Sequence, residues 1–145
     1  MTLAIIAFAA IGIVVTAAFF RATQPEKPDL TLVFRPPLPP WHVKPGYSFQ
    51  VGIEVMNNAG TSSVARGVQV KVVAPPGFII SGSNANQWNR NFGDLDGGDG
   101  ENETLTVTVM SGVQPGNYNI ETRTWATNAP EQIGTSQVVV ELTLP

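Results

Sequence analysis

Residues 47–55 read YSFQVGIEV, and they decide the fold class because apolar and polar side chains alternate along the stretch. Successive side chains of a β-strand point to opposite faces, so this alternation predicts a strand that buries one face. The buried row would be Tyr47, Phe49, Val51, Ile53 and Val55. Pro45 and Gly46 stand just before the stretch and are typical of a turn that leads into a strand.

The same period-two pattern recurs on both sides of this stretch. It predicts further strands over residues 30–35, 68–72, 78–80 and 104–109, a long strand within 114–128, and a last strand within 135–145. Residues 36–41, PPLPPW, predict a polyproline-like crossing, and residues 81–91, SGSNANQWNRN, predict a polar loop. Seven or eight short strands, with turn signals about every ten residues, are typical of an immunoglobulin-like β-sandwich. We therefore expect a mainly β protein.

Four segments carry a resemblance to a known group of domains. They are VKPGYSFQVGIEVMNNAG (43–60), VQVKVVAPPGF (68–78), FGDLDGGDGENETLTVTV (92–109) and QPGNYNIETRTWATN (114–128). In this order they resemble strand B, strand C, the L-x-x-G-E/D turn and the PGxY turn of the DUF11, CARDB and NEW3 group of Ig-like surface domains. The resemblance covers nearly all of residues 29–145. It implies a spacer or adhesive module on a cell surface.

The N-terminal residues 1–20, MTLAIIAFAAIGIVVTAAFF, carry no charged side chain. A helix over residues 2–20 would span about 28 Å, close to the hydrocarbon thickness of a bilayer. No basic residue precedes the run and no small-x-small cleavage site follows it, so we expect the segment to be retained. The chain then divides into a hydrophobic α-helix (1–23), a proline-containing linker (24–29) and a β-sandwich head (30–145).

Small side chains lie on several faces of this predicted helix. They are Ala4, Ala7, Ala9, Ala10, Gly12, Thr16, Ala17 and Ala18. Without water, small residues let helix backbones approach closely, so these positions are candidates for packing against other copies of the helix. A single-pass membrane anchor that is rich in alanine is the alternative.

The first basic residue of the chain is Arg21, although a retained N-terminal anchor normally carries its positive charges before the apolar run. A processed N-terminus would account for this order. The run resembles the mature N-terminus of archaeal type IV pilins and archaellins, in which a short charged leader is removed from in front of an Ala/Ile/Val-rich helix. The resemblance implies helices bundled in a filament core with β-sandwich heads outside. The predicted helix ends near Thr23, before Pro25 and Pro28, which is short for that family.

Composition argues against several classes of function. The 8 Lys and Arg are spread along 145 residues and the formal net charge is −3, so we expect no nucleic-acid partner. There is no cysteine, and the one histidine, His42, lies beside the proline-rich crossing. The G-x-S-x-G, P-loop and H-E-x-x-H motifs are absent. We expect no enzymatic activity and no cofactor.

Three sets of residues are candidate sites. Asp94, Asp96, Asp99 and Glu101 lie in a glycine-rich stretch and are candidate calcium ligands, although their spacing is not that of an EF-hand and a solvated turn is the alternative. Asn102 begins the glycosylation sequon Asn-Glu-Thr at a predicted turn-to-strand boundary. Trp41, Trp88 and Trp125 would form either an adhesive patch or part of the core.

The sequence thus predicts a structural subunit of an extracellular, pilus-like filament at the cell surface, used for adhesion or motility. It would be inserted in the membrane before assembly and then associate with itself into a homopolymer. Surface glycans and envelope proteins are candidate partners. The alternative is a membrane-anchored envelope protein whose Ig-like head binds a surface layer or filament, as stator proteins of the archaellum do. A secreted adhesin with its signal still attached is a third hypothesis.

Overall fold

The computed structural model describes residues 27–142, which form nine β-strands in two sheets and no helix. Sheet A has the order β1 (Leu30–Arg35), β3 (Ser48–Asn57), β7 (Gly100–Val109) and β5 (Phe78–Ile80). Sheet B has the order β2 (Trp41–Val43), β9 (Ala129–Val140), β8 (Gly116–Ala126), β4 (Val64–Val73) and β6 (Gln87–Asp96). The predicted helix over residues 1–23 lies outside the described residues, as does most of the linker.

Within residues 27–142, no helix is long and apolar enough to cross a lipid bilayer.

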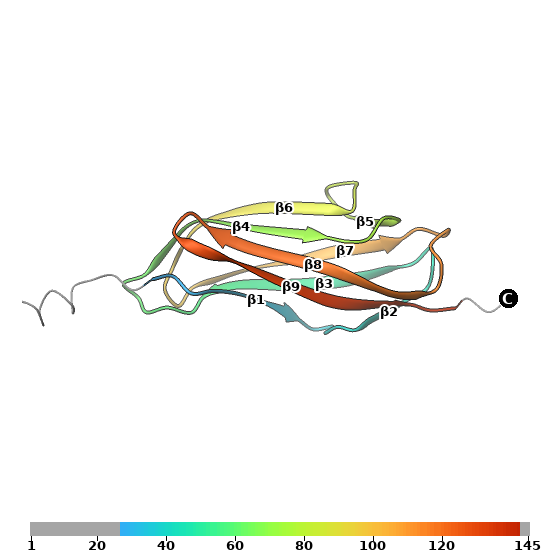
Figure 1. The fold of residues 1–145 in the computed structure, drawn as a ribbon, viewed down its shortest axis with the longest axis horizontal. Coiled ribbons are helices and arrows are strands. Elements are labelled where there is room, and N and C mark those ends of the chain that lie inside the picture. The colour runs from blue at the N-terminus through green and yellow to red at the C-terminus, as the bar shows by residue number, and fades with distance from the viewer. Residues whose placement is uncertain (1–26, 143–145) are drawn as a thin grey trace, which may run out of the picture.

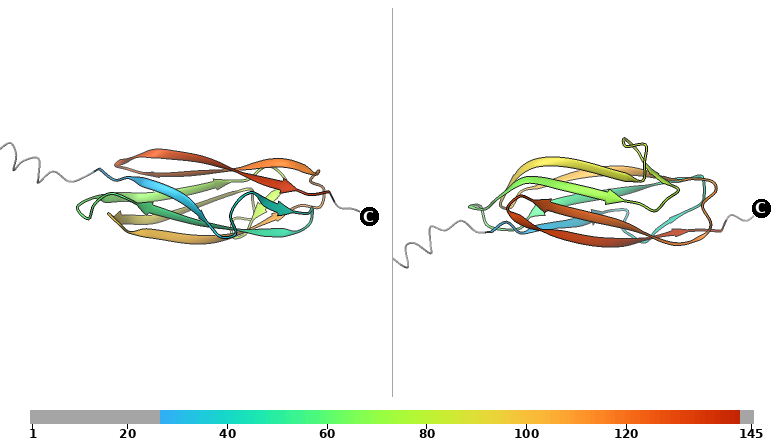
Figure 2. Two further views of the ribbon diagram at one scale, coloured as in Figure 1. Left: turned by 90° about the horizontal axis from the view of Figure 1, so that it is seen from below. Right: turned by 45° about the horizontal axis from the view of Figure 1, so that its top comes forward.

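The two sheets form two layers, and both contribute side chains to one hydrophobic core (Figure 1 and Figure 2). The inward rows expected from the sequence are confirmed. They are Val51, Ile53 and Val55 on β3, Leu105, Val107 and Val109 on β7, and Val68, Val70 and Val72 on β4, all at most 2% exposed. Burying an aliphatic side chain of this size stabilises a fold by about 1.5–3 kcal/mol, so these rows hold the sheets together.

Tyr47 was expected in the buried row of the third strand, and this expectation is wrong. The strand β3 begins one residue later, and the Tyr47 side chain is 65% exposed. Its backbone N–H donates to the carbonyl of Lys44 over 3.1 Å, so Tyr47 closes the turn that precedes the strand. The geometry of the turn therefore sets the direction of the Tyr47 side chain, and the alternation of the following strand residues does not extend to it.

The expected count of seven or eight strands is also wrong, because two of the nine strands gave no clear sequence signal. The strand β2 has three residues and pairs in parallel with β9, with Trp41 opposite Val138. The proline-rich crossing therefore carries the chain from sheet A to sheet B. The second missed strand is β6, which includes residues 87–91 of the predicted polar loop and pairs with β4.

The head is elongated, and the described chain enters it at one end and leaves it at the other (Figure 1). We call the end where β1 begins the N-terminal end, and the opposite end the distal end. The N-terminal end contains the β3–β4 loop (58–63), the β6–β7 turn (97–99) and the β8–β9 turn (127–128). The distal end contains the β2–β3, β4–β5 and β7–β8 turns, which are joined by backbone hydrogen bonds of Gly46 and Met110.

Candidate functional surfaces

The N-terminal end is organised around Asn57, which is fully buried at the end of β3. Its side-chain oxygen accepts hydrogen bonds from the backbone N–H groups of Asp29 (3.1 Å) and Ala59 (3.3 Å). Its side-chain nitrogen donates to the carbonyl of Leu95 over 3.1 Å. The neighbouring Asn58 adds a backbone hydrogen bond to the carbonyl of Asp29. Asn57 therefore fixes the point at which the chain enters the head.

Gly97 brings two loops of this end into close contact. It is buried, and its N–H donates to the carbonyl of Ser63 over 2.7 Å. A Cβ atom added to Gly97 would overlap the backbone carbonyl of Gly60 in the β3–β4 loop. Only a residue without a side chain fits here, and the two loops are consequently packed backbone against backbone.

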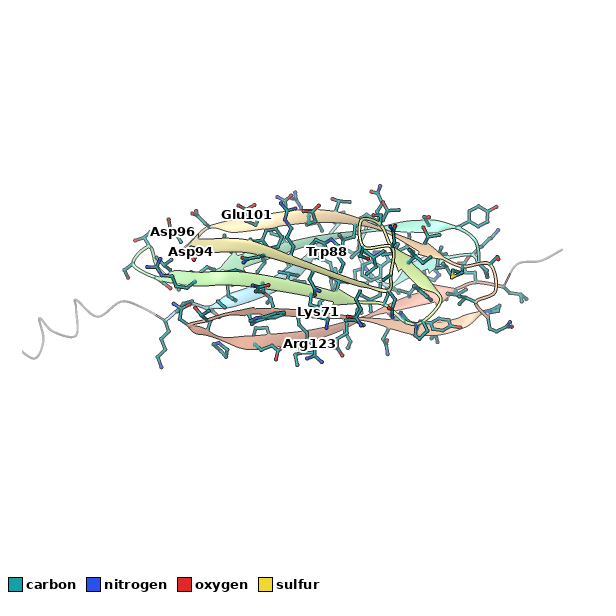
Figure 3. The ribbon with its side chains drawn as sticks, turned by 90° about the horizontal axis from the view of Figure 1, so that it is seen from above. Lys71, Trp88, Asp94, Asp96, Glu101 and Arg123 are labelled. Carbon is teal, nitrogen blue, oxygen red and sulfur yellow. The ribbon has the colours of Figure 1, made fainter. Side chains whose placement is uncertain are left out.

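The four candidate calcium ligands do not converge on one point. Asp94 uses both oxygens within the protein, because Oδ1 accepts from the N–H of Gly67 and Oδ2 from Nη1 of Arg66, each over 2.9 Å. Figure 3 shows Asp94, Asp96 and Glu101 near the N-terminal end of the head. Across residues 27–142, no three or more His, Cys, Asp or Glu side chains are grouped so that they could hold a metal ion.

Asp94 instead holds a bulge of β4 in place. The pairing of β4 with β6 shifts register between Ala65 and Val68, and Gly67 adopts a φ of +60°. From the other side, Asn128 accepts from the N–H of Arg66 and donates to the carbonyl of Val64, each over 2.8 Å. The hydrogen bond from Gly67, and then that from Arg66, lowers the pKa of Asp94 below its usual value of 3.8.

The lowered pKa of Asp94 predicts a pH-dependent contribution to stability. A carboxyl whose pKa is depressed by folding stabilises the protein above its unfolded pKa, and this contribution disappears as the pH falls through the folded pKa. We expect Asp94→Asn to lower the free energy of unfolding at pH 7, and the difference from wild type to disappear as the pH falls below 3.8 and through the lowered pKa of Asp94. Urea unfolding of both proteins from pH 7 down to acidic pH measures this difference in the free energy of unfolding. Asp96→Asn is the control, because the Asp96 side chain makes no hydrogen bond within the described residues. An equal loss in both variants would contradict the prediction.

The sequon residue Asn102 lies near the start of β7 with its side chain exposed on the outer face of sheet A. It pairs with Glu54 across the sheet, and Thr104 pairs with Gly52 on the same face. Thr106 and Thr108 continue this row along β7. The outer face of sheet A is therefore rich in hydroxyl and amide groups, and the sequon is accessible on it.

A polar depression of about 310 Å³ opens on the same face, beside the sequon. Its lining residues are Arg35, Pro36, Pro37, Gln50, Gly52 and Thr104. This depression was not predicted from the sequence. Gly52, which interrupts the outward polar row of β3, was the available signal, because glycine inside a strand often marks a close approach.

The three tryptophans do not form one patch. Trp41 is 4% exposed, and its indole N–H donates to the carbonyl of Pro37 over 3.0 Å. Trp88 pairs with the fully buried Val72 and packs against the core. Trp125 pairs with Gln69 on the opposite, outer face of sheet B. Only Trp125 is thus placed on an outer face.

Charges on the outer face of sheet B are largely paired. The Nε atom of Arg123 donates to Glu121 over 2.6 Å, and Nη1 lies 3.6 Å from Glu131. The hydrogen bond to Glu121 is the largest cause that raises the pKa of Arg123. Lys71 lies opposite Arg123 in the register of β4 and β8 (Figure 3). Its side chain makes no ion pair within the described residues.

The distal end carries exposed apolar side chains. Tyr47, Met110 and Leu142 are 65%, 51% and 65% exposed. Backbone hydrogen bonds from Val109 to the carbonyl of Tyr47 and from Met110 to the carbonyl of Gly77 bring the first two together. His42 lies in β2 nearby, with Nδ1 3.1 Å from Oε1 of Glu141. This end is more apolar than the N-terminal end.

No family model matches the sequence, and no curated protein matches it either. Several solved structures are similar. AvmM, which catalyses macrocyclization in alchivemycin A biosynthesis, is 7% identical with a TM-score of 0.55 over 83% of this chain and 92% of that chain. BslA, a bacterial hydrophobin, is 10% identical with a TM-score of 0.46 over 81% of this chain and 96% of that chain. A family 123 glycoside hydrolase from Clostridium perfringens is 11% identical with a TM-score of 0.49, over 71% of this chain and 22% of that chain. At these identities the likeness concerns the fold alone.

Proposed function

We propose that this chain is a structural subunit of an extracellular, pilus-like filament. Residues 1–23 pack as helices in the filament core, and the head, an immunoglobulin-like β-sandwich, faces outward. One observation carries the proposal: Asp29, at the end of the predicted linker, is fixed to the head by Asn57 and Asn58, which bind both of its backbone groups. A filament subunit needs a defined angle between its core segment and its head, and a clamped junction supports such an angle.

The proposed role is non-catalytic. The single imidazole of the chain, His42, is exposed and engaged with Glu141 near the C-terminal end of β9. Its Nδ1 is therefore occupied by the carboxylate of the residue that follows the neighbouring strand β9. A general base must be within hydrogen-bond reach of a nucleophile, and no serine or threonine hydroxyl bonds to His42 within the described residues. This contact with Glu141 supports a structural role for His42.

The second candidate function is a membrane-anchored envelope protein whose head binds a surface layer or a filament. The apolar distal end favours it, because Tyr47, Met110 and Leu142 are exposed at the end farthest from the N-terminal segment. A head held away from a membrane by its N-terminal segment would present this end to a partner. The two functions differ in whether residues 1–23 contact other helices or lipid.

Shearing cells and separating the released material from the membranes distinguishes the two functions. We expect this chain in sheared filaments visible by electron microscopy, with the head on their surface. Immunogold labelling of the head shows whether the head lies on the filament surface. Recovery of the chain only in the detergent-extracted membrane fraction would contradict the filament and support the anchored envelope protein.

A matched pair of variants in the N-terminal segment tests the packing of small residues. We expect Gly12→Leu to prevent filament assembly, because the added side chain keeps helix backbones apart. Ile13→Leu changes shape without adding volume, so it should assemble as the wild type does. Circular dichroism of both proteins checks that the head still folds. Normal filaments from Gly12→Leu would contradict a core built on close helix packing.

A further inference from the structure

The polar depression on the outer face of sheet A has the composition of a small-ligand site. Its volume of about 310 Å³ lies at the lower end of the range of such sites. Arg35, Gly52 and Thr104 occupy one row across β1, β3 and β7, because Gly52 pairs with Arg35 on one side and with Thr104 on the other. Gln50, two residues along β3, lies on the same face. Charged, amide and hydroxyl groups from three strands thus meet at one point.

Arg35 is the only cation that lines the depression, and its charge is not used elsewhere. Its guanidinium makes no ion pair or hydrogen bond within the described residues. The nearest acidic residue on this face by register is Glu54, in the adjoining row. A Cβ on Gly100 would lie 3.6 Å from Oε1 of Glu54, so this carboxylate is directed toward Gly100, on the side away from Gly52. An unpaired guanidinium here favours an anionic ligand group.

The glycine at the floor is not required by the backbone. Gly52 is buried and lies in the middle of β3, with no φ in the left-handed region. Glycine in the middle of a strand weakens the strand, so another feature of the structure must account for a glycine here. A Cβ on Gly52 would lie 3.1 Å from Cβ of Arg35 and would occupy the floor of the depression. Gly52 therefore keeps the depression open.

We propose that this depression binds a uronic acid, that is, a sugar unit that carries a carboxylate. The Arg35 guanidinium pairs with the carboxylate through two parallel N–H groups. Gln50 and Thr104 can each donate and accept, which suits the vicinal hydroxyls of a sugar ring. Pro36 and Pro37 provide apolar surface for the C–H groups of the ring. An acidic peptide fits less well, because near the depression it could add a strand only at β1, at the edge of sheet A, whereas Gln50 and Gly52 lie on β3, which is paired on both sides.

The test compares a sugar with a carboxylate, a sugar without one, and a carboxylate without a sugar. The full chain is produced in a host without N-glycosylation and kept in a polyoxyethylene detergent, which contains no sugar. It is titrated with the methyl glycosides of glucuronate and galacturonate, with methyl glucoside, and with N-acetylglutamate amide, and binding is followed by NMR. We expect millimolar binding of at least one uronate, at least tenfold weaker binding of the glucoside, and no comparable binding of the amino acid.

Variants assign the binding to the depression. Arg35→Gln should weaken uronate binding about tenfold or more, and Thr104→Val about fivefold, since each removes one hydrogen-bonding group. Gly52→Ala fills the floor and should abolish binding, and its NMR spectrum shows whether it is folded. Lys71→Gln removes an unpaired cation from the opposite sheet and should bind as the wild type does. The proposal would be overturned if no uronate bound, or if the glucoside or N-acetylglutamate amide bound as tightly as the uronate. It would also be overturned if Lys71→Gln weakened binding as much as Arg35→Gln does. The head alone carries this site, so none of these results bears on filament assembly.

Discussion

The Asn57→Ala variant is expected to lose about 3 kcal/mol of its free energy of unfolding, because three hydrogen bonds of a fully buried side chain disappear together. The backbone N–H groups of Asp29 and Ala59 lose their acceptor, and the carbonyl of Leu95 loses its donor. Alanine is too small to fill the space and cannot replace any of the three. Urea unfolding of the full chain, followed by tryptophan fluorescence, measures the loss.

The neighbouring Asn58 provides the matched control for this substitution. Its side chain is exposed and donates to the hydroxyl of Thr31 over 2.6 Å, where water can replace the lost partner. We expect Asn58→Ala to cost at most about 0.5 kcal/mol. Hydrogen exchange at Asp29 should accelerate in Asn57→Ala and stay slow in Asn58→Ala. Equal stabilities of the two variants would show that Asn57 does not clamp the entry of the chain.

The second large effect is expected for Gly97→Ala. The added Cβ overlaps the carbonyl of Gly60, and a backbone atom cannot move aside as a flexible side chain can. The β3–β4 loop and the β6–β7 turn must separate, which also breaks the hydrogen bond from Gly97 to Ser63. We expect a loss of about 2–3 kcal/mol in the free energy of unfolding, again from urea curves.

Gly112→Ala is the control for this clash. An added Cβ at Gly112 meets no atom within 4 Å, and the residue has no φ in the left-handed region. The change should be neutral or slightly stabilising, because alanine restricts the unfolded chain more than glycine does. A neutral result for Gly97→Ala as well would mean that the two loops are not held in contact.

The sequence predicted the core rows because alternation is a local property of a strand. Val68, Val70 and Val72 lie in a single stretch, and their burial needs no knowledge of the partner strand. The strand β6 was missed because it lies at a sheet edge and reads QWNRNFGDLD, with little apolar alternation. On its inner side, Arg90 forms an ion pair with Glu103 of the other sheet and lies over the ring of Phe92. A charged pair thus replaces the apolar side chains that mark other strands.

The residues of the candidate sites were harder to predict because they depend on distant partners. Asp94 resembled a calcium ligand in sequence, but its partners Arg66 and Gly67 lie about thirty residues away and reach it only through the bulge of β4. Arg35 and Thr104 come together only through the pairing of three strands. The strand β2 gave no signal because its partner, β9, lies almost a hundred residues later. The filament and the helix over residues 1–23 stay predictions.

The parallel pairing of β2 with β9 determines how the head responds to mechanical tension. A pull between the two ends of the described chain acts along the strands, since the chain enters the head at one end and leaves it at the other (Figure 1). It draws β1 against β3 and β2 against β9 lengthwise, and the hydrogen bonds between strands run across that direction. All the bonds of each pair are then loaded in shear at once, instead of opening one after another from an end. Such a geometry resists extension of the head along its long axis.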